Sequence, residues 1–92
     1  MFPDYLDNAK VFFFTSKGDY GKMSDEYGKT VASFSFLAIC KYENDDRYYL
    51  FGCNADFEVE ADYDCSSTDE CMETAKSVFR GDFAWIAKGC TK

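Results

Sequence analysis

The feature that most constrains the fold is a strict alternation of apolar and acidic residues over residues 57–64. Phe57, Val59, Ala61 and Tyr63 hold the odd positions, and an acid holds every even position. Successive side chains of a β-strand point to opposite faces of the sheet, so this pattern predicts a strand with one buried and one solvated face. Such a strand needs neighbouring strands and an apolar layer against its buried face.

Three further strands are expected upstream of the alternating strand. Residues 10–16 and 47–53 are dense in the β-branched and aromatic residues that favour strands. Residues 30–42 have apolar side chains at both parities, which predicts a central strand covered on both faces. The polar cluster at 43–46 predicts a turn that joins two of these strands in a hairpin. Residues 17–29 contain three glycines among polar residues and predict a long, mobile loop.

One helix is expected after the alternating strand. Ser67 and Glu70 have the spacing of a capping box, in which each side chain bonds the backbone amide of the other residue. Arg80 and Gly81 are typical of a helix end. Residues 83–88 are interpreted either as a final edge strand or as a tail packed under the helix. The apolar stripe expected to face the sheet consists of Cys71, Met72, Ala75, Val78 and Phe79.

These elements predict a single α+β domain over residues 1–92: an antiparallel meander of four to five strands packed by one helix in the C-terminal half. Residues 1–9 are interpreted as a mixed polar lead-in. An apolar content of 47% is too high for a disordered chain. No apolar run reaches the roughly 18 residues of a membrane span. The N-terminal residues lack the basic and apolar segments of a secretory signal, so we expect a cytoplasmic protein.

The composition argues against several classes of chemistry. The chain has no histidine, no phosphate-binding glycine loop and no nucleophile motif, so we expect no enzyme and no cofactor. Five cysteines are an odd number without a C-x-x-C pair, and they are expected to be reduced and packed as small apolar residues, with no metal site. A net charge of −7 disfavours direct binding to nucleic acid or anionic membrane and favours a basic protein partner.

The candidate binding residues are acidic. Carboxylates at alternate positions of one strand stand about 6.6 to 6.8 Å apart on one face, a spacing similar to that of single-strand phosphates. From residue 48 to residue 75 there are eight carboxylates and neither lysine nor arginine. The alternative interpretation is that the acids keep the domain soluble and protect an exposed sheet edge from aggregation. The expected partner-binding residues are Asp56, Glu58, Glu60, Asp62 and Asp64, with Asp45 and Asp46 from the preceding turn.

A pattern of structural positions extends over residues 48–86. It consists of Tyr48-Tyr49-Leu50-Phe51-x-Cys53, then Phe57-Glu58-Val59 with Asp62, then Ser67, Glu70 and Ala75 at the helix start, and late in the chain Trp85-Ile86. In these positions the chain resembles the small cytoplasmic immunity proteins that bacteria encode beside secreted polymorphic toxins. The resemblance implies an antitoxin that covers the active site of a toxin domain, often a basic nuclease, or docks beside it. Glu60, Asp64 and the five cysteines depart from the pattern.

A second hypothesis comes from another class of protein. A phage-encoded inhibitor, such as an anti-CRISPR or anti-restriction protein, can act as a DNA mimic that blocks the nucleic-acid channel of a defence nuclease. Both hypotheses use carboxylates against a basic partner, and the sequence alone leaves both open.

Overall fold

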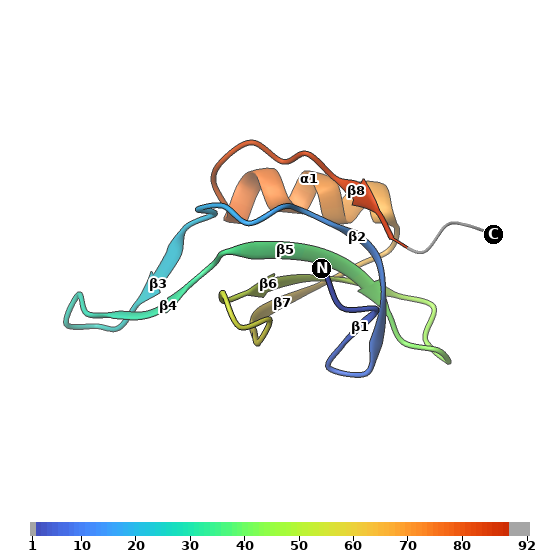
Figure 1. Cartoon of the computed structure of the whole chain (residues 1–92), viewed down its shortest axis with the longest axis horizontal. Helices are drawn as coiled ribbons and strands as arrows, with labels where there is room; N and C mark the ends of the chain where they lie inside the picture. Colours follow the sequence, from blue (N-terminus) through green and yellow to red (C-terminus); the bar gives the residue numbers. More distant parts are fainter. Residues whose placement is uncertain (1, 89–92) are drawn as a thin grey trace.

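The computed structural model describes residues 2–88 and shows an α+β fold in which one helix packs against a curled antiparallel sheet (Figure 1). The expected fold class is confirmed. The elements, in chain order, are β1 (Tyr5–Leu6), β2 (Ala9–Phe14), β3 (Lys22–Ser24), β4 (Thr30–Ser33), β5 (Phe36–Lys41), β6 (Tyr48–Cys53), β7 (Val59–Cys65), α1 (Thr68–Val78) and β8 (Ile86–Ala87).

The main sheet has six strands, with β1, β2, β5, β6 and β7 side by side in that order and β8 also paired with β2. β1 covers the first part of the outer edge of β2, where Tyr5 pairs with Lys10. β8 covers the second part, where Phe13 pairs with Ala87. The sheet has one strand more than the expected four to five, because β1 has only two residues, too few for a periodic pattern. β8 lies within residues 83–88, for which a final edge strand was one of the two expected arrangements. The other edge of the sheet is β7.

The N-terminal segment differs from the expected polar lead-in, because it contains a strand and buried apolar residues. β1 turns back into β2 through Asp7 and Asn8, which have φ angles of 53° and 70°. Positive φ at both central residues is the geometry of the tight turns that match the twist of a hairpin. Phe2 and Leu6 are buried against the sheet face that the helix leaves free.

The expected long loop at residues 17–29 is instead the outer part of a bent hairpin. β3 and β4 pair as a two-stranded ribbon that projects from the body of the molecule, whose longest dimension is 46 Å (Figure 1). The expected single strand over residues 30–42 is divided into β4 and β5 at Phe34 and Ser35. Four backbone hydrogen bonds join the ribbon to the sheet. The Phe34 N–H donates to the Gly21 carbonyl, and the Tyr20 N–H donates to the Phe34 carbonyl. The Gly18 N–H donates to Ser35, and the Thr15 N–H donates to Leu37. β2 and β5 are therefore the inner arms of one long antiparallel hairpin, and β3 and β4 are its outer arms.

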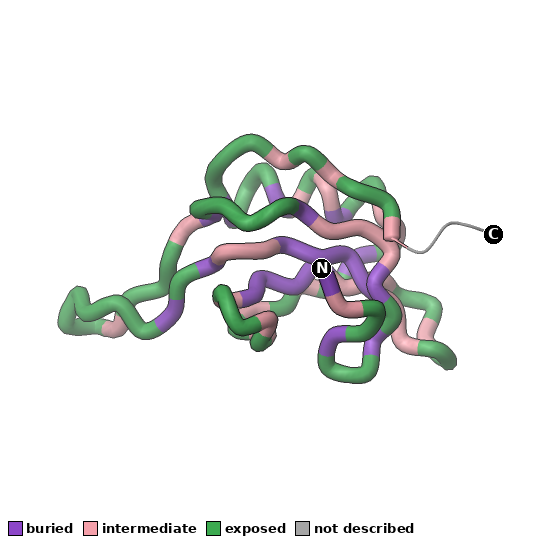
Figure 2. Tube along the Cα trace, viewed as in Figure 1, coloured by how far each residue is buried: buried purple, intermediate pink, exposed green. Residues whose placement is uncertain are grey.

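Apolar side chains are buried on both faces of the sheet. Figure 2 shows where the buried positions lie along the chain. β5 shows this most clearly, because Leu37 and Ile39 pack toward the helix while Ala38 and Cys40 pack toward the other face. The prediction of a central strand covered on both faces is therefore confirmed. The helix-side layer also contains Leu50, Cys65, Cys71, Ala75 and Phe79, and the opposite layer also contains Phe2, Leu6, Val11, Phe51 and Cys53.

Helix α1 begins after Ser67, whose Oγ accepts a hydrogen bond from the Glu70 N–H at 3.1 Å, as expected. The other half of the capping box differs, because the Glu70 carboxylate accepts from the N–H and hydroxyl of Ser66. The expected apolar stripe is also corrected at its end. Val78 is 43% exposed and lines a shallow groove beside the base of the ribbon.

The C-terminal segment combines the two expected arrangements. Ile86 and Ala87 form β8, while Phe83 and Trp85 pack against the helix-side layer. Four cysteines are buried with free thiols, and Cys90 lies outside the described residues. Over residues 2–88, no helix has the length and apolar character needed to cross a membrane.

Candidate binding face

The acids of β7 lie on the sheet face that the helix leaves free. Glu60, Asp62 and Asp64 are exposed, while the odd positions between and after them pack toward α1. Asp62 stands directly across from Phe51 on β6, and Asp64 stands across from Tyr49. Directly opposed residues share a face, and Phe51 and Tyr49 belong to the layer opposite the helix. The prediction of a strand with one buried and one solvated face is confirmed from Ala61 onward. Val59 was expected on the buried face but packs against the layer opposite the helix, because the strand register shifts between Gly52 and Cys53.

The expected run of five carboxylates in one strand is interrupted. β7 begins only at Val59, and Asp56 and Glu58 lie in the preceding turn. Phe57 has a φ of 65°, a left-handed conformation that reverses the chain and breaks the alternation. Its ring stacks on Phe36 with centroids 4.6 Å apart, which helps to stabilise this turn.

Asn54 organises this turn and draws two acids together. Its Oδ1 accepts hydrogen bonds from the N–H groups of Asp56 and Glu58. Its Nδ2 donates to Glu58 Oε1 at 2.7 Å and to Glu60 Oε2 at 2.9 Å. The carboxylates of Glu58 and Glu60 therefore converge on one amide instead of standing one strand repeat apart.

The turn between β5 and β6 brings Asp45 to the same face. Asp45 Oδ1 accepts from the Arg47 N–H, and Oδ2 accepts from the Tyr49 hydroxyl at 2.7 Å. These two hydrogen bonds hold the pKa of the Asp45 carboxyl below its usual range. Asp46 is exposed in the same turn.

A pair of tyrosines lies between these acids. Tyr42 and Tyr49 pack edge to face with ring centroids 5.3 Å apart. Burial raises the pKa of Tyr42, and the carboxylates of Asp7 and Asp62 raise it further because they oppose a phenolate. We call the group the acidic tyrosine face, which consists of Tyr42, Tyr49, Asp7, Asp45, Asp62 and Asp64. Glu60 extends this face along β7 toward Asn54.

Asp7 is the acid of this face that was not expected from the sequence. It lies in the β1–β2 turn, far in sequence from the other acids, and it acts on Tyr42 because β1 pairs with the edge of β2. The Asp7-Asn8 dipeptide was the available signal, because these residue types tolerate the left-handed turn conformation.

The charge distribution differs from the expected one in two respects. The Arg47 guanidinium lies 3.2 Å from the Asp64 carboxylate, so one end of the acidic row has a base beside it. The helix acids Asp69, Glu70 and Glu73 belong to the layer on the other side of the sheet and do not extend the acidic tyrosine face. The face is thus a compact cluster, in contrast to a long row.

The chemistry available at this face is recognition of cations. Carboxylates accept charge-assisted hydrogen bonds from arginine and lysine, and tyrosine rings offer a surface on which a guanidinium can stack. The thiols of Cys40 and Cys53 are poor nucleophiles, because burial raises the pKa of Cys53 to about 12 and that of Cys40 further. Within the described part of the chain no three metal-ligating side chains come together.

Comparison with protein-family models finds no match, and neither the curated proteins nor the solved structures contain a significant match to the chain.

Proposed function

We propose that this protein is a non-catalytic inhibitor of the immunity type, which binds a basic toxin domain one to one through its acidic tyrosine face in the cytoplasm. The observation that carries the proposal is the convergence of acids from three separate segments on the Tyr42–Tyr49 pair. Asp7 comes from the β1–β2 turn, Asp45 from the β5–β6 turn, and the remaining acids from β7.

Electrostatics explain why such a face suits an inhibitor. Carboxylates clustered on one face attract a basic partner and raise the association rate well above that of a neutral surface. Like charges held close together repel one another, so the cluster lowers the stability of the isolated protein. A basic partner relieves that repulsion on binding.

The tyrosines add what charge alone does not provide. Tyrosine is among the residue types that dominate binding energy at protein interfaces, since it buries a large ring and keeps a polar end. Tyr49 already donates its hydroxyl to Asp45, which fixes the ring and leaves its free surface available to a partner side chain. An arginine of the partner can contact both carboxylate and ring at once.

The phage-inhibitor hypothesis rests on a different geometry. A DNA mimic needs carboxylates repeated at the spacing of phosphates, and only Glu60, Asp62 and Asp64 share one strand in this protein. The compact cluster around two tyrosines favours recognition of a protein surface, so we place the immunity function first.

The test is a binding measurement between the purified protein and the toxin-domain product of its neighbouring gene. The double variant Glu60→Lys/Asp62→Lys should slow association at low salt by about tenfold or more and flatten its salt dependence. The matched control Glu26→Lys/Glu73→Lys makes the same change in net charge at exposed positions away from the face, and it should keep most of the wild-type rate.

Equal losses in the two double variants would show that only net charge matters and would contradict the proposed face. Absence of binding to the neighbouring gene product, together with displacement of DNA or guide RNA from a defence nuclease, would replace the immunity function with the phage-inhibitor function.

A further inference from the structure

Two lysines stand directly opposite each other on β2 and β5, on the sheet face that α1 occupies further along. Lys10 pairs with Lys41 in the strand register. Like charges directly across a strand pair are destabilising. The chain has a net charge of −7, so two lysines placed directly opposite each other suggest a role for their combined positive charge.

Neither lysine has a carboxylate partner among residues 2–88, since no carboxylate oxygen of these residues lies within 4.0 Å of either ammonium nitrogen. Two acids interact with these lysines from further away, Asp4 with Lys10 and Asp45 with Lys41. Asp4 is already paired with Lys88 at 2.8 Å, and Asp45 already accepts two hydrogen bonds within its own turn and from Tyr49. The two ammonium groups therefore remain available to an external anion.

Aromatic rings hold both ammonium groups in place. Lys10 Nζ lies 5.7 Å from the centroid of the Phe12 ring, and Lys41 Nζ lies 5.8 Å from that of Tyr48. The two rings contact each other edge to face with centroids 5.9 Å apart. The lysines are thus positioned over one aromatic pair instead of extending freely into solvent.

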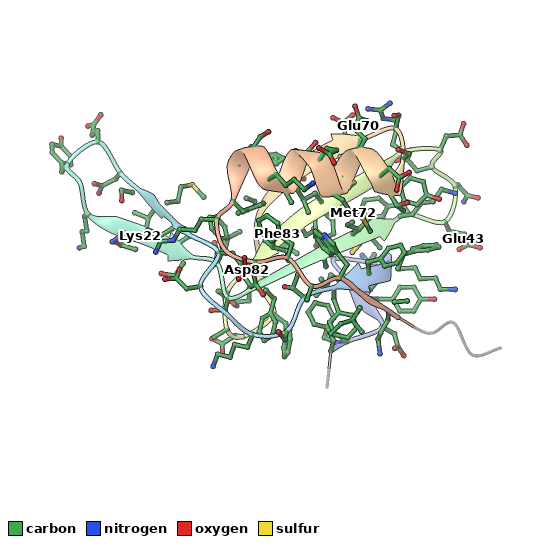
Figure 3. The ribbon with its side chains drawn as sticks, turned by 90° about the horizontal axis from the view of Figure 1, so that it is seen from above. Lys22, Glu43, Glu70, Met72, Asp82 and Phe83 are labelled. Carbon is green, nitrogen blue, oxygen red and sulfur yellow. The ribbon has the colours of Figure 1, made fainter. Side chains whose placement is uncertain are left out.

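The lysines line a cavity of about 370 Å³ at the end of the sheet. This volume lies within the range of small-molecule sites, roughly 300 to 1,000 Å³. The Tyr5 ring, 61% exposed, stands at its rim, and Asn8 and Glu43 add an amide and a carboxylate. Figure 3 shows Glu43 at the end of the molecule opposite the ribbon, which carries Lys22.

We propose that this cavity binds a nucleoside monophosphate. The phosphate lies between the ammonium groups of Lys10 and Lys41, and the base packs against the exposed Tyr5 ring. Asn8 and Glu43 accept hydrogen bonds from the sugar hydroxyls or the base amino groups. Two ammonium groups against one carboxylate leave the cavity with one net positive charge, which suits an anion. Both lysines are used by the first phosphate, and the further phosphates of a triphosphate would meet no other base among the lining residues.

The experiment titrates the full chain with AMP, ATP, adenosine and inorganic phosphate, followed by amide chemical shifts and calorimetry. AMP should bind about tenfold more tightly than any of the other three, with shifts confined to β1, the start of β2 and the end of β5. Lys10→Gln and Lys41→Gln should each weaken AMP binding by about tenfold or more, because each removes a charged hydrogen bond.

The matched control is Lys29→Gln, which removes the same charge from the ribbon and should bind AMP as the wild type does. Each variant's melting temperature shows whether it has folded, and Lys41→Gln should melt no lower than the wild type because it relieves the repulsion between the lysines. Equal weakening by Lys29→Gln, or phosphate binding as tight as AMP binding, would overturn the nucleoside site. So would the absence of AMP-dependent shifts at millimolar ligand.

Discussion

Phe79 connects the helix to the sheet and to the base of the ribbon. Its ring packs edge to face on Phe34 at 5.0 Å and on Tyr63 at 5.9 Å. It also closes over Gly52, where an added Cβ would lie 2.8 Å from the ring. The ring therefore fills the space that a glycine on the central strand β6 leaves open.

Phe79→Ala should lower the free energy of unfolding by about 3 kcal/mol or more, because it empties a buried aromatic site. Val78→Ala is the matched control, since the neighbouring side chain is exposed and should cost less than about 1 kcal/mol. Chemical denaturation of the two variants measures the difference. Similar values for both would mean that Phe79 does not anchor the helix.

At the scale of single residues, the sequence predicted the direction of a side chain better than it predicted which other residues pack against that side chain. Helical spacing correctly placed Cys71, Ala75 and Phe79 toward the sheet, but it could not show that Val78 at the end of the stripe is exposed. The break before β7 was also hidden, because Phe57 is not a residue type that favours a positive φ. Contacts made after folding, such as the stack on Phe36, decide such cases.

At the scale of elements, the helix start depends on side chains that satisfy free backbone amides. Ser67 Oγ accepts from the Glu70 N–H, and the Glu70 carboxylate bonds Ser66 in turn. This interlocking joins the end of β7 to the first turn of α1.

Ser67→Ala should lower the free energy of unfolding by about 1 kcal/mol, because one amide of the first turn loses its acceptor. Ser77→Ala makes the same chemical change at an exposed position inside the helix, where alanine is favoured, and it should be neutral or slightly stabilising. Thermal or urea unfolding of both variants tests the comparison. A loss of stability in Ser77→Ala as large as in Ser67→Ala would contradict the capping role.

Elements with a long periodic pattern could be predicted, whereas short or interrupted elements could not. The alternation in β7 and the capped helix gave clear signals, whereas the two-residue strand β1 depends on long-range pairing with β2 and was not expected. β8 was expected only as one of two arrangements of residues 83–88. The ribbon was hidden because its three glycines and polar residues are also typical of an open loop. For the binding face, the β7 acids were predicted, and the turn that adds Asp7 was not.

At the scale of the whole molecule, several exposed acids link stability to pH. Backbone and side-chain hydrogen bonds from Gly21, Arg47 and other donors hold the pKa of these carboxyls below their usual values of 3.8 for aspartate and 4.5 for glutamate. The hydrogen bond and the charge of Lys88 lower the pKa of the Asp4 carboxyl in the same way. The four acids are Asp4, Asp19, Asp45 and Glu70.

A depressed folded-state pKa stabilises the fold at pH values above the unfolded-state pKa, and this stabilisation is lost as the pH falls through the folded-state pKa. The melting temperature should therefore fall as the pH is lowered below about 4. Asp45→Asn should reduce this dependence, while Asp46→Asn, an exposed neighbour in the same turn, should leave it unchanged. Melting curves recorded from about pH 3 to about pH 7 test both variants. A wild-type slope in Asp45→Asn would contradict the role of its hydrogen bonds.

The bent hairpin from β2 through the ribbon to β5 shapes how the chain reaches its native topology. Thr15 and Leu37 are 22 residues apart, and closing such a loop in one step would cost about 2.7 kcal/mol or more in chain entropy. The backbone hydrogen bonds instead form a series from Asp25 and Lys29 at the tip to Thr15 and Leu37 in the sheet, with one register shift between Met23 and Ser24. Once one bond of this series has formed, the next bond closes only a few additional residues. The series thus offers a route of local steps from the tip of the ribbon to the pairing of Lys10 with Lys41, the most distant pair between β2 and β5.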